Sequence, residues 1–122
     1  MNEIYKPINP IERGGADNAL NELKISVRYD KGSMNYFANQ VNKRGLYVHF
    51  SPVHRGNGFI SSTLLGSRKE SGFKIFVREL GRASQKQADD VFSRVEPLAD
   101  EIAKKWNTED WDGIYQMVKQ AV

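Results

Sequence analysis

The 122-residue sequence has no cysteine. Disulfide bonds, cysteine-ligated zinc and thiol catalysis are therefore excluded. No apolar run approaches the roughly 20 residues of a membrane-spanning helix. Residues 1–20 also lack an apolar stretch of signal-peptide length. We therefore expect no membrane partner and a cytoplasmic location.

Patterns typical of catalysis or metal binding are equally scarce. His49 and His54 are the only histidines, and no carboxylate lies between them, which disfavours a metal site. Ser71 and Lys74 match an S-x-x-K spacing, but Gly72 and the alternation after it predict a turn into a strand, not the helix that this motif needs. The sequence has no phosphate-binding loop and no dinucleotide fingerprint. We predict no catalytic residue, no metal and no cofactor, and expect that the protein is not an enzyme.

The composition, 39% hydrophobic and 27% charged, is typical of a globular domain. We predict a single domain over residues 21–122. Residues 1–20, with Pro7, Pro10 and a Gly-Gly pair, are predicted to form an N-terminal arm in which residues 16–20 form one helical turn. Three alternatives stay open for this arm: it is disordered, it is swapped onto a partner, or it is added to the sheet as a strand.

The net charge of +3 is unevenly distributed. Residues 22–84 carry eleven Lys or Arg against four Asp or Glu, a net charge of +7. Residues 85–122 carry five against eight, a net charge of −3. This asymmetry favours an acidic partner for the middle of the chain, although segregation for solubility would leave the same pattern.

The clearest strand covers residues 44–52, where Leu46, Val48 and Phe50 alternate with Tyr47 and His49. Similar alternation predicts strands over residues 22–29, 59–65 and 73–80, and a short strand or hairpin arm over 34–41. In the strand over 73–80, Lys74, Phe76 and Arg78 are expected to share one face.

The apolar spacing changes to 3.6 residues after residue 84 and predicts helices over 84–106 and 109–121. Ser84 with Gln87 forms a capping-box pattern. Pro97 should kink or divide the first helix because it lacks a backbone donor. Thr108 is predicted to cap the second helix.

Strands followed by helices predict an α+β fold: an antiparallel sheet of four to five strands with two C-terminal helices packed on one face. The other face would stay open to solvent, and it would combine basic with aromatic side chains. The candidate binding residues are Lys24, Arg28, Lys43, Arg44, Tyr47, His49, Arg55, Lys74, Phe76 and Arg78.

Basic side chains neutralise phosphates, and aromatic rings stack on unpaired bases. The predicted function is therefore binding of single-stranded nucleic acid on this sheet face. The alternative is a protein-interaction or oligomerisation module in which the aromatic residues are cross-strand partners or face another subunit. A small enzyme with an unrecognised site is a third, minority interpretation.

The segment K-R-G-L-Y-V-H-F-S-P resembles the Whirly and transcriptional positive-coactivator type of single-stranded-DNA-binding protein. In that family a basic residue and a glycine open a strand that ends near a proline. The resemblance covers residues 22–106 in layout and 43–52 in motif; it implies single-strand binding by a homodimer across curved sheets. The second C-terminal helix, the arm and the missing K-G-K-A-A-L signature depart from the family. The matching positions are Lys43, Arg44, Gly45, Leu46, Val48 and Pro52.

Overall fold

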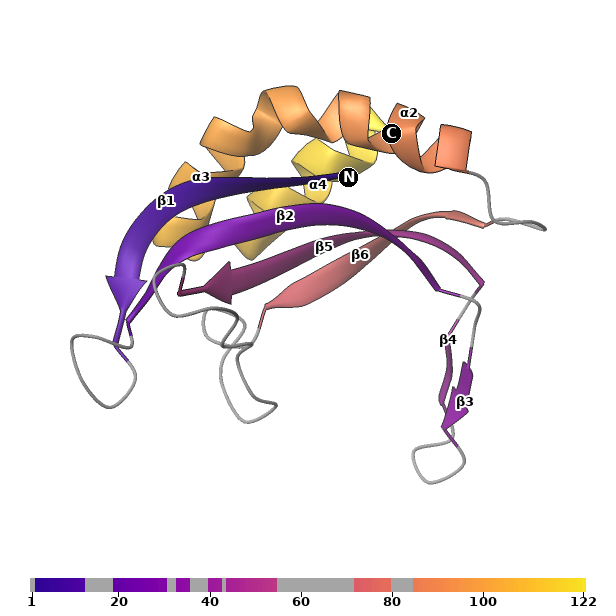
Figure 1. The fold of residues 1–122 in the computed structure, drawn as a ribbon, viewed down its shortest axis with the longest axis horizontal. Helices are drawn as coiled ribbons and strands as arrows, with labels where there is room; N and C mark the ends of the chain where they lie inside the picture. Colours follow the sequence, from indigo (N-terminus) through magenta and orange to yellow (C-terminus); the bar gives the residue numbers. More distant parts are fainter. Residues whose placement is uncertain are drawn as a thin grey trace.

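A computed structural model of the chain describes residues 2–12, 19–30, 33–35, 40–42, 44–54, 72–79 and 85–122. The strands form an antiparallel meander in the order β1-β2-β5-β6, and the helices cover one face of it (Figure 1). The strands are β1 (Glu3–Ile11), β2 (Leu20–Asp30), β5 (Gly45–Val53) and β6 (Phe73–Glu79). The helices are α2 (Gln85–Val95), the 3₁₀ helix η2 (Glu96–Leu98), α3 (Ala99–Asn107) and α4 (Trp111–Ala121). The predicted α+β fold is confirmed.

A second, two-stranded sheet extends the connection between β2 and β5. It consists of β3 (Ser33–Asn35) and β4 (Gln40–Asn42), which agrees with the hairpin arm and not with the single short strand, the two alternatives predicted over 34–41. The strand predicted over 59–65 and the cap at Ser84 lie outside the described residues. None of the described helices has the length and apolarity needed to cross a bilayer.

The N-terminal segment is the added strand among the three alternatives for it. β1 pairs antiparallel with β2, with Ile4 opposite Ile25 and Lys6 opposite Leu23. Pro7 makes this strand hard to predict from the sequence, because proline is unusual inside a sheet. A proline is tolerated on an edge strand or at a bulge. β1 is an edge strand, and its register with β2 shifts between Pro7 and Ile11. The proposed helical turn is not formed at its end, because residue 20 already begins β2.

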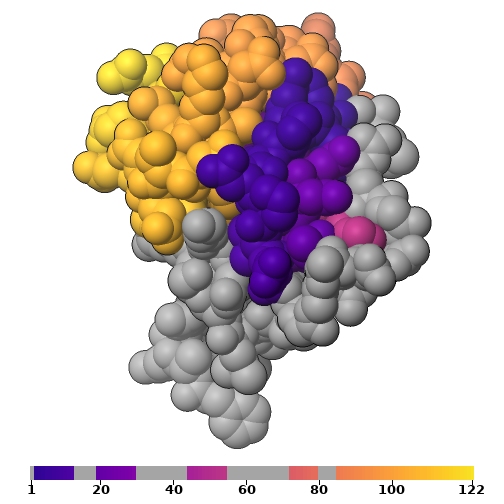
Figure 2. All heavy atoms as spheres, turned by 90° about the vertical axis from the view of Figure 1, so that its left-hand side faces the viewer, coloured from indigo at the N-terminus to yellow at the C-terminus, as the bar shows by residue number. Residues whose placement is uncertain are grey.

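Polar contacts attach β1 to the helices, and Figure 2 shows the strand lying directly against them. Lys6 Nζ lies 2.9 Å from Asp100 Oδ1, and the backbone N–H of Asn9 donates to Asn107 Oδ1 at 2.8 Å. The Asn2 amide donates to Asp89 Oδ1 at 2.8 Å. Hydrogen bonds from Gln85 and then Asn2 lower the pKa of the Asp89 carboxyl. β1 is thus an integral edge of the sheet.

The hydrophobic core lies between the sheet and the helices. Leu46, Val48 and Phe50 of β5 are fully buried, as their alternation predicts. An aromatic stack joins the two layers: the Phe73 and Trp106 rings are parallel within 2° at 5.8 Å. Trp106 is also fully buried, and the other large side chains that are fully buried in the described part of the chain are Leu20, Leu23, Ile25, Val91, Val95, Ile102, Ile114 and Val118.

Pro97 divides the first helix as predicted, because α2 ends at Val95 and η2 replaces one turn before α3. The predicted cap at Thr108 is wrong. Asp110 is the N-cap of α4, and its Oδ1 accepts from the Gly113 N–H at 3.0 Å. Thr108 instead ends α3, and its hydroxyl donates to the Lys105 carbonyl at 3.2 Å. The chain turns at Glu109, where φ is 56°, so the second helix starts later than predicted.

Replacement of Asp110 by Ala should therefore destabilise the fold by about 1 kcal/mol, the usual cost of a lost N-cap. Thr108→Ala should cost less than about 0.5 kcal/mol, like most exposed substitutions. Asp110→Asn keeps the capping acceptor and serves as the control, with stability close to that of the wild type. Urea denaturation measures all three variants, and a larger loss for Thr108→Ala than for Asp110→Ala would contradict the assigned cap.

Candidate nucleic-acid interface

The sheet face opposite the helices, here called the open face, is organised in rows that cross the strands. Side chains on it alternate with the core residues, so cross-strand partners share it. In Figure 1, β2 bends away from the helices at both ends, so the open face is concave. The first row is Arg28–Tyr47–Phe76; the second is Glu3–Ser26–His49–Lys74; the third is Tyr5–Lys24–Ser51. Six of the ten predicted site residues are brought together here: Lys24, Arg28, Tyr47, His49, Lys74 and Phe76.

Tyr47 departs from the open stacking ring that the sequence predicts, because it is only 7% exposed. Its ring meets Phe76 edge-on at 5.2 Å and 66°, and Lys74 Nζ lies 4.6 Å from its centroid. Aromatic pairs prefer this T-shaped arrangement, and a cation over a ring is attracted to its negative face. Tyr47 therefore supports Phe76 and Lys74 and presents little surface of its own.

Phe76 owes its position to Gly45. A Cβ at Gly45 would lie 2.9 Å from Phe76 Cε2 and 2.2 Å from the Arg78 carbonyl oxygen. Only glycine allows β6 and this ring to approach β5 so closely. Phe76 remains half-buried, so part of its ring stays accessible.

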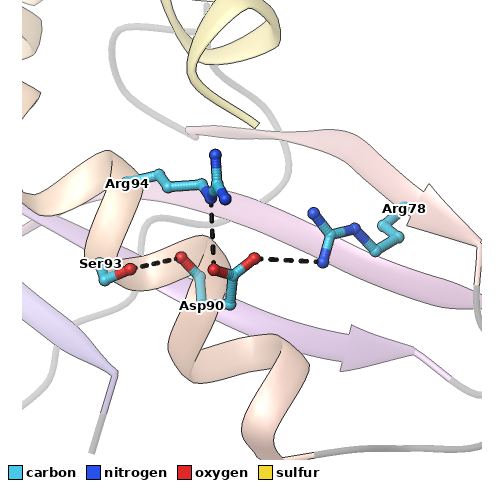
Figure 3. Close-up of polar contacts among 4 residues, drawn as sticks. All are labelled: Arg78, Asp90, Ser93 and Arg94. Atoms are coloured by element: carbon cyan, nitrogen blue, oxygen red, sulfur yellow. Dashed lines mark hydrogen bonds and ion pairs between the residues drawn. The ribbon is translucent and has the colours of Figure 1, made fainter.

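Arg78 does not lie with Lys74 and Phe76, so its predicted position on the open face is wrong. Phe76 pairs with Tyr47 but Arg78 pairs with Leu46, which leaves Val77 as an extra residue in β6. Such a bulge turns the residues after it to the other face. Arg78 consequently points to the helices, where its Nη1 lies 3.4 Å from Asp90 Oδ2 (Figure 3).

Asp90 is the centre of this cluster on α2. Its Oδ1 accepts from Arg94 Nε at 3.3 Å, and its backbone carbonyl accepts from the Ser93 hydroxyl at 2.7 Å (Figure 3). Arg78 thus links β6 to a helix surface that is itself cross-linked. This is a structural role away from the open face.

Arg44 is also directed to the helix side, since its Nε donates to the Tyr29 hydroxyl at 2.7 Å. Tyr29 packs partly against the core. Lys43 and Arg55 lie outside the described residues. His54 Nδ1 lies 2.9 Å from the Ala19 carbonyl and fixes the end of β5 to the start of β2. No group of three or more metal-ligating side chains occurs within the described ranges.

Charge on the open face is unevenly distributed. Lys24 Nζ lies 3.3 Å from Glu3 Oε2, so its charge is partly neutralised near β1. Arg28 and Lys74 are exposed and flank the Tyr47–Phe76 pair. The exposed cations of the open face therefore lie on β2 and β6, on either side of β5, and the exposed Glu79 at the end of β6, opposite Gly45, adds a negative charge to the same face.

Sequence reasoning missed Tyr5 and Glu3 on this face because they belong to the N-terminal segment. Tyr5 is half-buried opposite Lys24 and adds an aromatic ring at the β1 edge. Ile4, Lys6 and Ile8 occupy alternate positions, as residues on one face of a strand do. The charge of Lys6 and the proline next to it interrupt the apolar pattern, so the strand is hard to recognise from the sequence.

Comparisons with protein-family models, with curated proteins and with solved structures give no match for this chain. Any function therefore has to be inferred from the geometry of the open face.

The contact between Gly45 and Phe76 leads to a prediction about stability. Gly45→Ala should destabilise the protein by about 1–3 kcal/mol, because the added methyl forces the Phe76 ring and the β6 backbone apart. Ser51→Ala on the same strand and face is the control, with a change below about 0.5 kcal/mol. Urea denaturation followed by near-UV circular dichroism measures both. Unchanged stability of Gly45→Ala would show that the close approach is absent.

Proposed function

We propose that this protein binds single-stranded nucleic acid, with DNA as the favoured form, on its open face. The observation that carries the proposal is the Arg28–Tyr47–Phe76 row with Lys74 beside it. It combines an accessible aromatic edge with two exposed cations, the two elements that single-strand platforms use. The concave shape of the face suits a flexible strand that follows its curvature.

Each residue of the row has a separate task in this proposal. Phe76 stacks against an unpaired base, while Tyr47 supports the Phe76 ring from the neighbouring strand through its edge-on contact. Arg28 and Lys74 neutralise backbone phosphates on either side. Lys24 contributes less, because Glu3 partly neutralises it.

The resemblance to Whirly and transcriptional positive-coactivator proteins supports the same function and adds the expectation of a homodimer. We extend the proposal accordingly to a homodimer, and we keep the cytoplasmic location expected from the sequence as part of the proposal. The resemblance lies in residues 43–52, which include β5 (Gly45–Val53) apart from its last residue. β5 is also the strand that positions Tyr47 and His49 on the open face.

The second candidate is a protein-interaction or oligomerisation module without catalytic activity. The burial of Tyr47 favours it, since a residue that is only 7% exposed is expected of a structural cross-strand partner. The two candidates differ in salt dependence, because contacts to phosphates weaken steeply as salt is added.

The direct test is fluorescence anisotropy of a labelled oligothymidylate titrated with protein at low salt and again at several higher salt concentrations. The proposal expects binding at micromolar protein with an affinity that falls with salt. No binding at micromolar protein and low salt would overturn it, and light scattering on the same sample would then decide whether the module self-associates.

Arg28 and Arg78 form a matched pair for mutation because they lie on β2 and β6 but on opposite faces. Arg28→Ala should weaken oligonucleotide binding and reduce the magnitude of the salt slope by about 0.7, the value for one phosphate contact on a single strand. Arg78→Ala should leave both unchanged and cost at most about 1 kcal/mol of stability through the lost ion pair. Equal losses of affinity in the two variants would argue against the open face.

Phe76→Ala should weaken binding by about 1–3 kcal/mol, the range measured for loss of one base-stacking ring. Phe76→Tyr keeps the ring and should bind within about 0.5 kcal/mol of the wild type. The anisotropy titration described above measures both. Wild-type affinity for Phe76→Ala would remove the stacking role.

A further inference from the structure

A groove lies between β6 and α4. Its volume is about 570 Å³, and its walls include Lys74 and Phe76 from the strand and Trp111, Asp112, Tyr115 and Lys119 from the helix. Among the described residues, β5 is the only strand paired with β6, so the groove borders the last strand of the described sheet.

On the helix side of the groove, an acidic, an aromatic and a basic side chain lie in one row along α4. Asp112, Tyr115 and Lys119 are spaced at i, i+3 and i+7, so they line one face of α4. Tyr115 is 44% exposed and is the one exposed large hydrophobic residue of the described chain. An acidic group, an aromatic ring and a basic group therefore follow each other along the helix.

Lys119 distinguishes between the ligands that such a groove would accept. Its Nζ lies 3.4 Å from the Phe76 carbonyl oxygen and 5.9 Å from the centroid of the Tyr115 ring. A peptide that extends the sheet needs outward carbonyls of β6 as acceptors, and a lysine at an edge strand opposes such pairing. An anion would instead find an ammonium group beside an exposed ring.

The groove is continuous with the open face, because Lys74 and Phe76 belong to both. Phe76 meets Tyr47 on the open face and also lines the groove, and Lys74 does the same. A polymer that follows the first two rows of the open face would reach the β6–α4 groove without crossing another strand.

We propose that the β6–α4 groove binds one nucleotide of the same single strand as it passes over the edge of β6. The base stacks on Tyr115, and its phosphate lies toward Lys119. Asp112 repels phosphate from the other end and accepts hydrogen bonds from base N–H groups, which fixes the direction of the nucleotide. This inference depends on the function proposed above.

The test compares variants of the full chain by anisotropy with a labelled oligothymidylate. Tyr115→Ala should bind about tenfold more weakly, since one stacked base is lost. Tyr115→Phe, which keeps the ring, and Gln116→Ala, an exposed neighbour on α4, should both stay within about twofold of the wild type. Lys119→Gln should reduce the magnitude of the salt slope by about 0.7.

A cross-linking measurement locates the contact independently of affinity. Ultraviolet irradiation with an oligonucleotide that contains 5-iodouracil should attach the strand to the peptide that carries Tyr115, as identified by mass spectrometry. Light scattering of each variant shows whether its assembly has changed.

Each outcome separates the inference from the proposed function. If Tyr115→Ala binds like the wild type while Phe76→Ala is weakened, the groove is not part of the path, and the open-face proposal stands. If Tyr115→Ala weakens binding only by dissociating the protein, the groove is a protein interface and the inference is overturned. If the wild type does not bind the oligonucleotide, both fall.

Discussion

The register in which β5 pairs with its neighbours determines which side chains meet the helices and which meet solvent. Leu46, Val48 and Phe50 are fully buried, so a slip by one residue would exchange them for Tyr47 and His49 in the core. The close approach at Gly45 makes such a slip still more costly, because a side chain there would meet the β6 backbone. The core and the open face are therefore two consequences of one pairing, and a change that shifts β5 should alter both.

The sequence predicts those parts of the molecule that follow a regular period. Alternation in β2, β5 and β6 and the 3.6-residue spacing after residue 84 are sufficient for the α+β fold, and Pro97 is sufficient for the break between α2 and α3. Features that depend on a single irregularity are missed. The bulge at Val77 moves Arg78 to the opposite face of the sheet, and no residue near it in the sequence indicates a bulge.

Burial and position within the sheet are the other properties that periodicity cannot supply. Alternation assigns Tyr47 to the correct face, but the packing of Phe76 and Lys74 around its ring leaves it 7% exposed. β1 is obscured because an edge strand tolerates Pro7. β1 also brings Glu3 and Tyr5 to the open face, so the charge of that face depends in part on a strand that periodicity does not reveal.

β6 contributes to both the open face and the β6–α4 groove. Its Phe76 and Lys74 side chains lie on the open face and also line the groove, while Arg78 forms an ion pair with α2. The most direct measurement of the central claim is the chemical-shift change of backbone amides when a single-stranded oligonucleotide is added to isotope-labelled protein. We expect the largest changes at Arg28, Lys74 and Phe76, with little change on the outer surface of α2 and α3. Changes confined to that outer helical surface, or none at saturating oligonucleotide, would contradict the assignment of the open face as the binding surface.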